Sequence, residues 1–397
     1  MSRIPKVVLL LESSRASGRA LLKGIADFAH HHGPWSFFWE PGGLESAKPL
    51  LKSLEADGVI MRDGENLDDV LKLGVPVVVV GHKRNEISNA VNVITDSTHI
   101  GQMGADHLMQ CGFKQFAFVG VCSSSNETAT WSQVREECFS RRLLERGFSS
   151  QNYLLQPTSK QNWANERNAL VAWLQSLPKP VGIMACNDDC GVQVMEACKI
   201  AGIVVPDLVG VVGVDNDEIV CGLANPAMSS VAINFERAGY EAAEVIHQLM
   251  QSKKAHGSQR ISVPATHVVT RRSTDFVAVS DVALGRALRF IRDNSRSAVG
   301  VNDVSKAAGL SRRALERRFR SELGVSILEQ IRKARTEQIC RMLVETSLPI
   351  GRIAEALGFE DVQHFARYFR SDRDMSPLAY RKSFGKQTLS QVPQNTA

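Results

Sequence analysis

Two stretches in the last third of the chain share one pattern: a short helix, a glycine followed by a bulky apolar residue, and a second helix with a polar outer face. The copies occupy residues 301–319 and 349–369, and their turn glycines, Gly309 and Gly358, lie 49 positions apart. The pattern predicts two helix-turn-helix units in tandem, at about residues 302–323 and 349–372. In such a unit the second helix enters a DNA major groove while the first crosses the backbone.

We expect the second helix of each unit to contact DNA through its polar face. Ser311 and Asp361 are placed as the N-caps, because each side chain can accept a hydrogen bond from an early backbone amide. Arg, Gln and Glu can pair with base edges, and Val or Ala can pack against a thymine methyl. The predicted contacts are Arg312, Arg313, Glu316, Arg317, Val362, Gln363, Ala366 and Arg367. The alternative is a solvated face with ion pairs such as Glu316 with Arg320.

Apolar residues predict how these units are held together. Leu315, Phe319 and Leu323 repeat on one helical face, as do Phe365 and Phe369, so these side chains are expected in the core. A further apolar series predicts a long helix that joins the units: Leu328, Ile331, Ile339, Met342 and Leu343.

Charge and composition fit a DNA-binding segment within an ordinary globular protein. Residues 281–397 carry 21 Lys and Arg against 13 Asp and Glu, whereas the upstream residues have a small acidic excess. At 397 residues, two to three domains are expected. No apolar stretch approaches the roughly 18 residues of a membrane span. The eight cysteines form no CxxC pair, which favours reduced thiols and a cytoplasmic location.

The upstream part alternates apolar runs with helical patterns. A helix is expected through Leu21, Leu22, Ile25 and Phe28, and another through residues 50–54. Strands that are uniformly apolar are covered on both faces, which predicts parallel sheets with helices above and below. The pattern restarts near residue 115, so we expect two successive doubly wound α/β lobes. The predicted strands are KVVLLLE, WSFFWE, GVIM, VPVVVVG, QFAFVG, YLLQ, VGIMAC, LVGVVGVD and SSVAI.

Polar residues follow several of these strands. Such lobes bind ligands outside the carboxyl ends of their strands. Residues 12–15 follow the first strand, Asp96 follows VNVIT, Asn187 and Asp188 follow VGIMAC, and Asp215 follows VVGV. A cleft lined by carboxylates, amides and arginine suits a neutral ligand with many hydroxyl groups, because each hydroxyl both donates and accepts.

Longer segments resemble two known families. VITDSTHIGQMGADHLMQCGFKQFAFVG, IMACNDDCGVQVMEACKIAGIVVP and VGVVGVDNDEIVCGLANPAMSSV resemble the type I periplasmic-binding-protein sensors of LacI/GalR-type regulators. GFEDVQHFARYFRSDRDMSPLAYR resembles the AraC/XylS-type signature. The departures are Asp374 in place of a usual glycine, and Thr336 and Ile339 in place of a usual Leu and Ala. The expected domains are a sensor at 1–270, a connection at 271–283, a DNA-binding domain at 284–384 and a disordered tail at 385–397.

The resemblance implies a sugar-responsive regulator that binds promoter DNA. It further implies a pentose effector, for which D-xylose is the leading candidate. Activation through RNA polymerase and a homodimer are also implied. The ligand-facing candidates carried over from it are Arg19, Asp96, Trp131, Arg135, Asn187, Asp188 and Asp215. For two of them, Asp96 and Asp188, capping of the following helix is the alternative, and Trp131 could be a core residue. A regulator of the same build that answers another sugar, or represses, is the alternative function.

An enzyme is the remaining alternative, and the sequence gives it little support. It contains no GxxxxGK[ST], GxSxG or HExxH motif, nor GxGxxG after a strand. His30, His31 and His32 precede a glycine where a helix is expected to end, a common place for such residues. We therefore expect no catalytic residue, no cofactor and no metal site.

Overall fold

The chain divides into two compact units, Met1–Asp281 and Val282–Ala397. The computed structural model describes residues 3–42, 55–64, 67–81, 87–122, 130–156, 163–252, 259–275 and 281–385. The helix expected at residues 50–54 and nearly all of the expected tail, residues 386–397, lie outside the described residues. Residues 271–275, expected in the connection, pack into the first unit instead, where Ser273 and Thr274 are fully buried.

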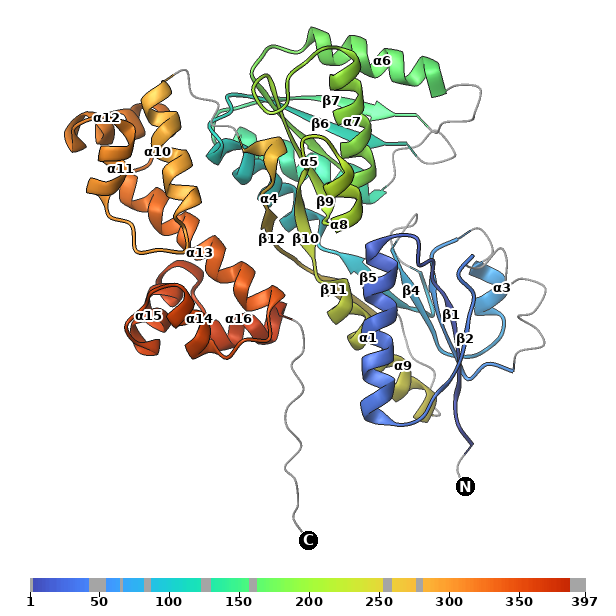
Figure 1. The fold of residues 1–397 in the computed structure, drawn as a ribbon. Coiled ribbons are helices and arrows are strands. Elements are labelled where there is room, and N and C mark those ends of the chain that lie inside the picture. The colour runs from blue at the N-terminus through green and yellow to red at the C-terminus, as the bar shows by residue number, and fades with distance from the viewer. Residues whose placement is uncertain are drawn as a thin grey trace. The chain divides into compact units, whose positions relative to one another are not determined.

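The first unit consists of two lobes, each built on a six-stranded sheet (Figure 1). The sheet of lobe 1 has the order β11-β5-β4-β3-β1-β2, and all its strand pairs are parallel. The elements of lobe 1 are β1 (Lys6–Leu10), α1 (Ala16–His32), β2 (Ser36–Trp39), β3 (Gly58–Arg62), α3 (Leu67–Leu71), β4 (Val77–Val80), β5 (Val91–Thr95), α9 (Phe235–Gln251) and β11 (Gln259–Val263).

Alternate side chains of the lobe 1 strands point to opposite faces of the sheet. On β1, Val7 and Leu9 belong to a buried cluster that contains α1, and Val8 and Leu10 belong to a second cluster that contains Leu67 of α3. Helices α1 and α9 lie side by side on the first face (Figure 1). Both faces of β1, β3 and β4 are therefore buried, as their uniformly apolar sequences predicted, whereas the edge strand β2 leaves Phe37 and Trp39 exposed.

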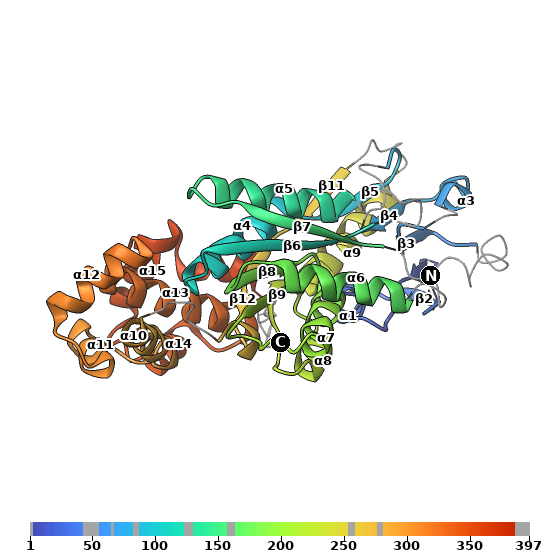
Figure 2. The ribbon, with the colours of Figure 1, turned by 90° about the horizontal axis from the view of Figure 1, so that it is seen from above.

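The sheet of lobe 2 has the order β12-β10-β9-β8-β6-β7. Helices α4 and α5 cover one face of it, and α6 and α7 cover the other (Figure 2). The elements of lobe 2 are α4 (Ser97–Gln110), β6 (Gln115–Val121), α5 (Thr130–Leu144), β7 (Ser150–Leu155), α6 (Trp163–Ser176), β8 (Val181–Ala185), α7 (Asp188–Ile200), β9 (Val209–Asp215), α8 (Glu218–Leu223), β10 (Ser229–Ile233), β12 (Ala265–Val269) and the 3₁₀ helix η2 (Arg272–Thr274).

One strand corrects the expectation of purely parallel sheets. The edge strand β12 runs antiparallel to β10. It begins one residue, Pro264, after the end of β11, which belongs to the sheet of lobe 1. No crossover helix therefore carries the chain to the opposite end of the lobe 2 sheet before β12 begins, as a parallel strand would need. The other strand pairs described in lobe 2 are parallel.

Three short segments connect the lobes, at residues 95–97, 233–235 and 263–265. The backbone amide of Asp96 in the first segment donates to the carbonyl of Val263 in the third at 2.8 Å. The carboxyl ends of strands from both sheets therefore meet at one place, which is where ligands bind in folds of this kind.

The second unit is all-α over its described residues. Its helices are α10 (Val282–Asp293), α11 (Val301–Ala308), α12 (Arg312–Leu323), α13 (Ile327–Glu345), α14 (Ile350–Ala356), α15 (Val362–Arg373) and α16 (Pro377–Phe384). The two predicted helix-turn-helix units are α11 with α12 and α14 with α15. Gly309 and Gly358 have φ angles of 71° and 70°, a left-handed conformation that glycine adopts at low cost.

The predicted joining helix is α13, which packs against helices of both units. Ile339 and Leu343 on this helix share a buried cluster with Phe365 and Phe369 of the second unit, as expected. Leu328 differs from the prediction, because its side chain is 61% exposed and lies outside the core. None of the helices in the described ranges is long and apolar enough to span a membrane.

Candidate ligand cavity and DNA-binding surface

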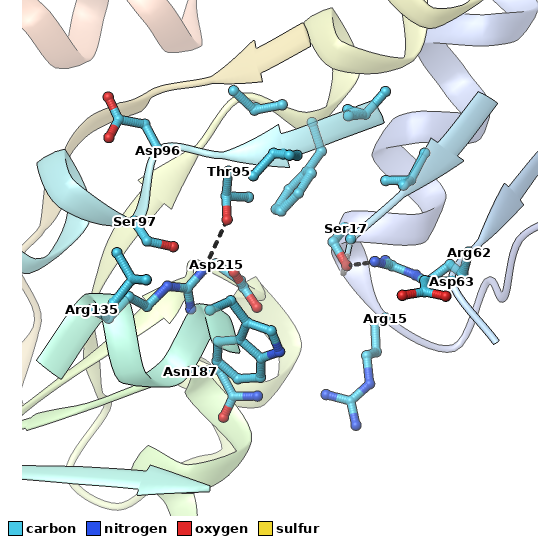
Figure 3. Close-up of a pocket in the computed structure, with 18 of the residues that line it drawn as sticks. Arg15, Ser17, Arg62, Asp63, Thr95, Asp96, Ser97, Arg135, Asn187 and Asp215 are labelled. Carbon is cyan, nitrogen blue, oxygen red and sulfur yellow. Dashed lines mark hydrogen bonds between the residues drawn. The ribbon is translucent and has the colours of Figure 1, made fainter. Parts of the chain in front are cut away.

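A cavity of about 660 Å³ lies between the two lobes, and Figure 3 shows it in close-up. Lobe 1 lines it with the segment after β1, the end of β3 and the ends of β5 and β11. Lobe 2 lines it with α5 and with the residues that follow β8 and end β9. Residues 96–98 and Phe235, where the chain crosses between the lobes, complete the lining. The cavity is thus at the edge where the sequence placed the polar residues.

Five of the seven predicted ligand-facing residues line this cavity: Asp96, Trp131, Arg135, Asn187 and Asp215. The other two, Arg19 and Asp188, do not belong to its lining. The guanidinium of Arg19 donates instead to the carbonyls of Ser13 and Ser14, at 2.8 and 2.9 Å. Asp188 is buried behind the cavity and accepts from the Ser230 hydroxyl at 2.6 Å.

Several polar lining residues were absent from the prediction: Glu12, Arg15, Ser17, Arg62, Asp63, Thr95, Ser97, Thr98 and Arg260. Glu12 and Arg15 follow β1, among the polar residues expected at a strand end, but neither is one of the ligand-facing candidates. Arg62 ends β3 and Asp63 follows it, so the same strand-end rule would have found both residues.

Arg135 is the buried cation of the cavity, with 4% of the residue exposed. Its guanidinium donates to the carbonyl of Cys186 and, at 3.4 Å, to the Thr95 hydroxyl. Burial lowers the pKa of Arg135, and the nearby carboxylate of Asp215 partly opposes this shift. Burial raises the pKa of Asp215, and the positive charges of Arg135, Arg62 and Arg15 act in the opposite direction.

Arg62 is held in place by neighbours on lobe 1. Its guanidinium forms an ion pair with Glu12 at 2.9 Å and donates to the Ser17 hydroxyl at 2.9 Å. In Figure 3, Arg62, Arg15 and Ser17 lie on the side of the cavity opposite Arg135 and Asn187. Charged groups from both lobes therefore face one space. Their hydrogen bonds and ion pairs already fix their orientation, so a ligand does not have to order them on binding.

Two lining residues also cap helices. The Asp96 side chain accepts from the His99 amide at 3.0 Å and caps α4, which was the alternative role for this residue. Asn187, and not Asp188, caps α7, because its side-chain oxygen accepts from the Cys190 amide at 2.9 Å. The side-chain amide group of Asn187 is the part that can donate to a ligand.

The predicted DNA-contacting residues lie on the outer faces of α12 and α15. Six of the eight are exposed, and Glu316 and Ala366 are half-buried. Ser311 and Asp361 cap the two helices as expected, accepting from the amides of Ala314 and His364. Glu316 also forms the ion pair with Arg320, at 3.7 Å. The exposed side chains of Arg312, Arg313 and Arg317 give this face of α12 the positive charge that contact with a phosphate backbone requires.

Family comparisons agree with this division of the chain. The model for the periplasmic binding protein-like domain matches residues 105–274, and that for a helix-turn-helix domain matches residues 304–383. The sensor also resembles the lac repressor dimer bound to operator and an anti-inducer, with a TM-score of 0.52 over 68% of this chain and 94% of that one. At 18% identity, that likeness shows the fold alone.

Relatives of the same two-domain build cover nearly the whole chain. It is 31% identical over 382 residues to the xylose operon regulatory protein of Escherichia coli (strain K12), covering 95% of this chain and 96% of the relative. The corresponding protein of Haemophilus influenzae is 27% identical over 95% of this chain and 98% of the relative. A solved structure of the xylose-binding transcription activator xylR is 29% identical, with a TM-score of 0.60 over 97% of this chain and 100% of that one. The chain therefore belongs to the family of xylose operon regulatory proteins, sugar-responsive transcription regulators that bind DNA through helix-turn-helix units.

Proposed function

We propose that this protein is a D-xylose-dependent activator of genes for pentose uptake and breakdown. The observation that carries the proposal is the cavity between the lobes, where Arg135, Asn187 and Asp215 face Arg15 and Arg62. Arginine and carboxylate groups hold sugar hydroxyls through charge-assisted hydrogen bonds, and the ring of Trp131 can stack on the C–H face of a sugar. The family relationship to proteins named for xylose supports this pentose as the effector.

The effector acts through linkage between two equilibria. A sugar that bonds to both lobes prefers the arrangement in which they are together, and it shifts the sensor towards that arrangement. In the proposed homodimer, this shift changes how well the paired helix-turn-helix units fit their sites. The DNA-bound protein then positions RNA polymerase at the promoter, within the cytoplasm.

The DNA-binding face is proposed to consist of the eight residues predicted on α12 and α15. Support comes from the exposure of six of them and from the repeated geometry of the two units, each with a capped second helix. We further propose that the protein has no enzymatic activity of its own. The polar groups of the cavity serve recognition, since Asp96 and Asn187 are engaged as helix caps and Arg62 is paired with Glu12.

Thermal unfolding across a panel of aldoses tests the effector. D-Xylose, L-arabinose, D-ribose and D-glucose are each added to the full-length protein at the same concentration. A ligand present at 100 times its dissociation constant adds about 2.7 kcal/mol of stability. D-Xylose should give the largest increase in unfolding temperature. A larger increase with another aldose would assign a different effector, and no increase with any aldose would refute sugar sensing by this cavity.

Reporter transcription in vitro tests the sign of regulation. Purified protein, RNA polymerase and the promoter fragment are combined with and without D-xylose. Transcript should increase only when protein and sugar are both present. A decrease would make the protein a repressor of the same build, and conversion or phosphorylation of the sugar during incubation with ATP would favour the enzyme.

A further inference from the structure

A short loop that starts at the last residue of β9 and leads to α8 has an unusual backbone. Asp215 and Asn216 are non-glycine residues with positive φ angles, 102° and 53°. Such conformations cost free energy and persist where the surroundings hold them. Here Arg271 donates to the Asn216 side chain at 2.8 Å, and the Asn216 amide donates to the Ser230 hydroxyl at 3.0 Å.

The next residue, Asp217 of lobe 2, has a side chain that bonds to lobe 1. One oxygen of its carboxylate accepts from the Ala16 backbone amide, the first residue of α1, at 2.8 Å. The same oxygen lies 3.8 Å from the guanidinium of Arg19. The other oxygen accepts from the amides of Ile219 and Val220 and so caps α8 within lobe 2. Asp217 is 6% exposed, so water competes weakly for these bonds.

Asp188 fixes the position of Asp217. Its carboxylate accepts from the Asp217 backbone amide at 2.7 Å and from the Ser230 hydroxyl at 2.6 Å. A second contact between the lobes lies nearby, an ion pair of Arg15 with Asp189. Arg19 and Asp188, the two ligand-facing candidates that do not line the cavity, are therefore both part of this contact between the lobes.

We propose that Asp217 is an inter-lobe latch: a positioning residue whose bond to the Ala16 amide stabilises the closed arrangement of the lobes and thereby sets ligand affinity. The bond joins one lobe to the other, so it exists only while they are together and adds to the stability of that state alone. The inference rests on the proposed function, in which the ligand binds between the lobes.

The loop also connects the latch to the cavity. Asp215 lines the cavity and Asp217 holds lobe 1, with only Asn216 between them. A ligand that contacts Asp215 thus contacts the loop that carries the latch. Ligand and latch favour the same closed state, so each strengthens the effect of the other.

Two substitutions remove the latch from opposite lobes. Asp217→Asn keeps an oxygen for the cap of α8, because Asn is also a good N-cap residue. It places an amide donor where the Ala16 amide needs an acceptor. Ala16→Pro deletes that amide at the first helical position, where proline is tolerated. The preceding residue, Arg15, already has the extended backbone that proline requires, with φ −105° and ψ 150°.

Glu218→Gln is the matched control. Glu218 is the exposed carboxylate next in sequence to Asp217, so this variant removes one negative charge at nearly the same place without changing the latch.

The distance between the lobes is measured in the full-length protein by pulsed dipolar spectroscopy. Spin labels are attached through unnatural amino acids at the exposed positions Lys72 of lobe 1 and Lys199 of lobe 2. The dissociation constant of D-xylose is measured by calorimetry.

Each latch variant should lengthen the mean inter-lobe distance in sugar-free protein and raise the dissociation constant about tenfold. The double variant should add little to either single variant, because both remove the same bond. Glu218→Gln should match the wild type in both measurements. Unchanged distances in Asp217→Asn and Ala16→Pro would overturn the latch, as would an equal change in Glu218→Gln. A wild type that does not bind D-xylose would contradict the proposed function instead, and the sugar-free distances would still decide the latch.

Discussion

The guanidinium of Arg135 lies 4.8 Å from the centre of the Trp131 ring, one helical turn away on α5. Both residues line the cavity between the lobes. The stacking holds the arginine while its hydrogen bonds reach the Cys186 carbonyl and Thr95. An aromatic ring and a buried cation thus lie together in the lining of the cavity, which is the arrangement expected for a site that binds a sugar by its C–H face and its hydroxyls.

Replacing the cavity tryptophan should weaken sugar binding. Trp131→Ala removes a stacking surface worth about 1 to 1.5 kcal/mol, so the dissociation constant of D-xylose should rise about tenfold. Calorimetry of the full-length protein measures it. Trp163→Ala is the control, because Trp163 stacks with Arg167 at 4.4 Å on α6 and does not line the cavity. Equal losses in the two variants would argue against a ring-stacking role.

The stability of the sensor should fall as pH rises from about 4 to 7. Burial and the nearby Asp215 raise the pKa of Asp188 to about 7. An unfolded Asp has a pKa near 3.9, so between about pH 4 and 7 the folded protein holds a proton that the unfolded chain has lost. Stability therefore decreases across this interval. Asp188→Asn has no such group, so its unfolding temperature should depend less on pH and exceed the wild type at pH 8. A steeper pH dependence in the variant would contradict this account.

Two arginines of α12 should separate base contacts from phosphate contacts. Arg317→Ala or Arg313→Ala should lose about 1 to 3 kcal/mol at one base pair if the residue pairs with a base. A phosphate contact should instead weaken all sequences and flatten the salt dependence. Titrations against operator variants at several salt concentrations measure both effects. Arg289→Ala, an exposed arginine of α10 outside both units, should change neither. Uniform losses in both α12 variants would rule out base contacts by these two residues.

Two glycines of the second helix-turn-helix unit should respond oppositely to alanine. Gly358 has a φ of 70°, so Gly358→Ala should destabilise the protein by about 1 to 2 kcal/mol even though its Cβ would meet no atom within 4 Å. Gly351 lies within α14, and its Cβ would make an ordinary 3.6 Å contact with Val362. Gly351→Ala should stabilise by up to about 1 kcal/mol. Urea unfolding of the full-length protein measures both, and effects of the same sign would contradict the prediction.

The fold was predictable because its signals are local. Gly309 and Gly358 mark the turns of two similar units. Strands such as β4, residues 77–80, have only apolar side chains. The antiparallel edge strand β12 was not predictable in this way. Its direction depends on the three-dimensional path of the chain between the lobes, which no local pattern records.

The position of the cavity was predictable from the sequence, but the direction of individual side chains was less so. Strand ends located the cavity edge, and Asp96, Asn187 and Asp215 follow from that rule. Asn187 and Asp188 are adjacent at the start of α7, yet one lines the cavity and the other is buried behind it. Arg19 lies one helical turn after Arg15 and bonds to backbone carbonyls instead. The direction of a side chain depends on its hydrogen-bond partners. These partners lie far away in the sequence or within the same loop, so the spacing of residues does not reveal them.

The most direct test of the account measures the affinity of the full-length protein for its promoter fragment with and without saturating D-xylose, at one fixed salt concentration. Linkage requires that the sugar change operator affinity by some factor and that operator DNA change sugar affinity by the same factor. We predict tighter operator binding with D-xylose, and a matching decrease in the dissociation constant of the sugar when DNA is present. Operator affinity that is identical with and without the sugar would contradict the central claim.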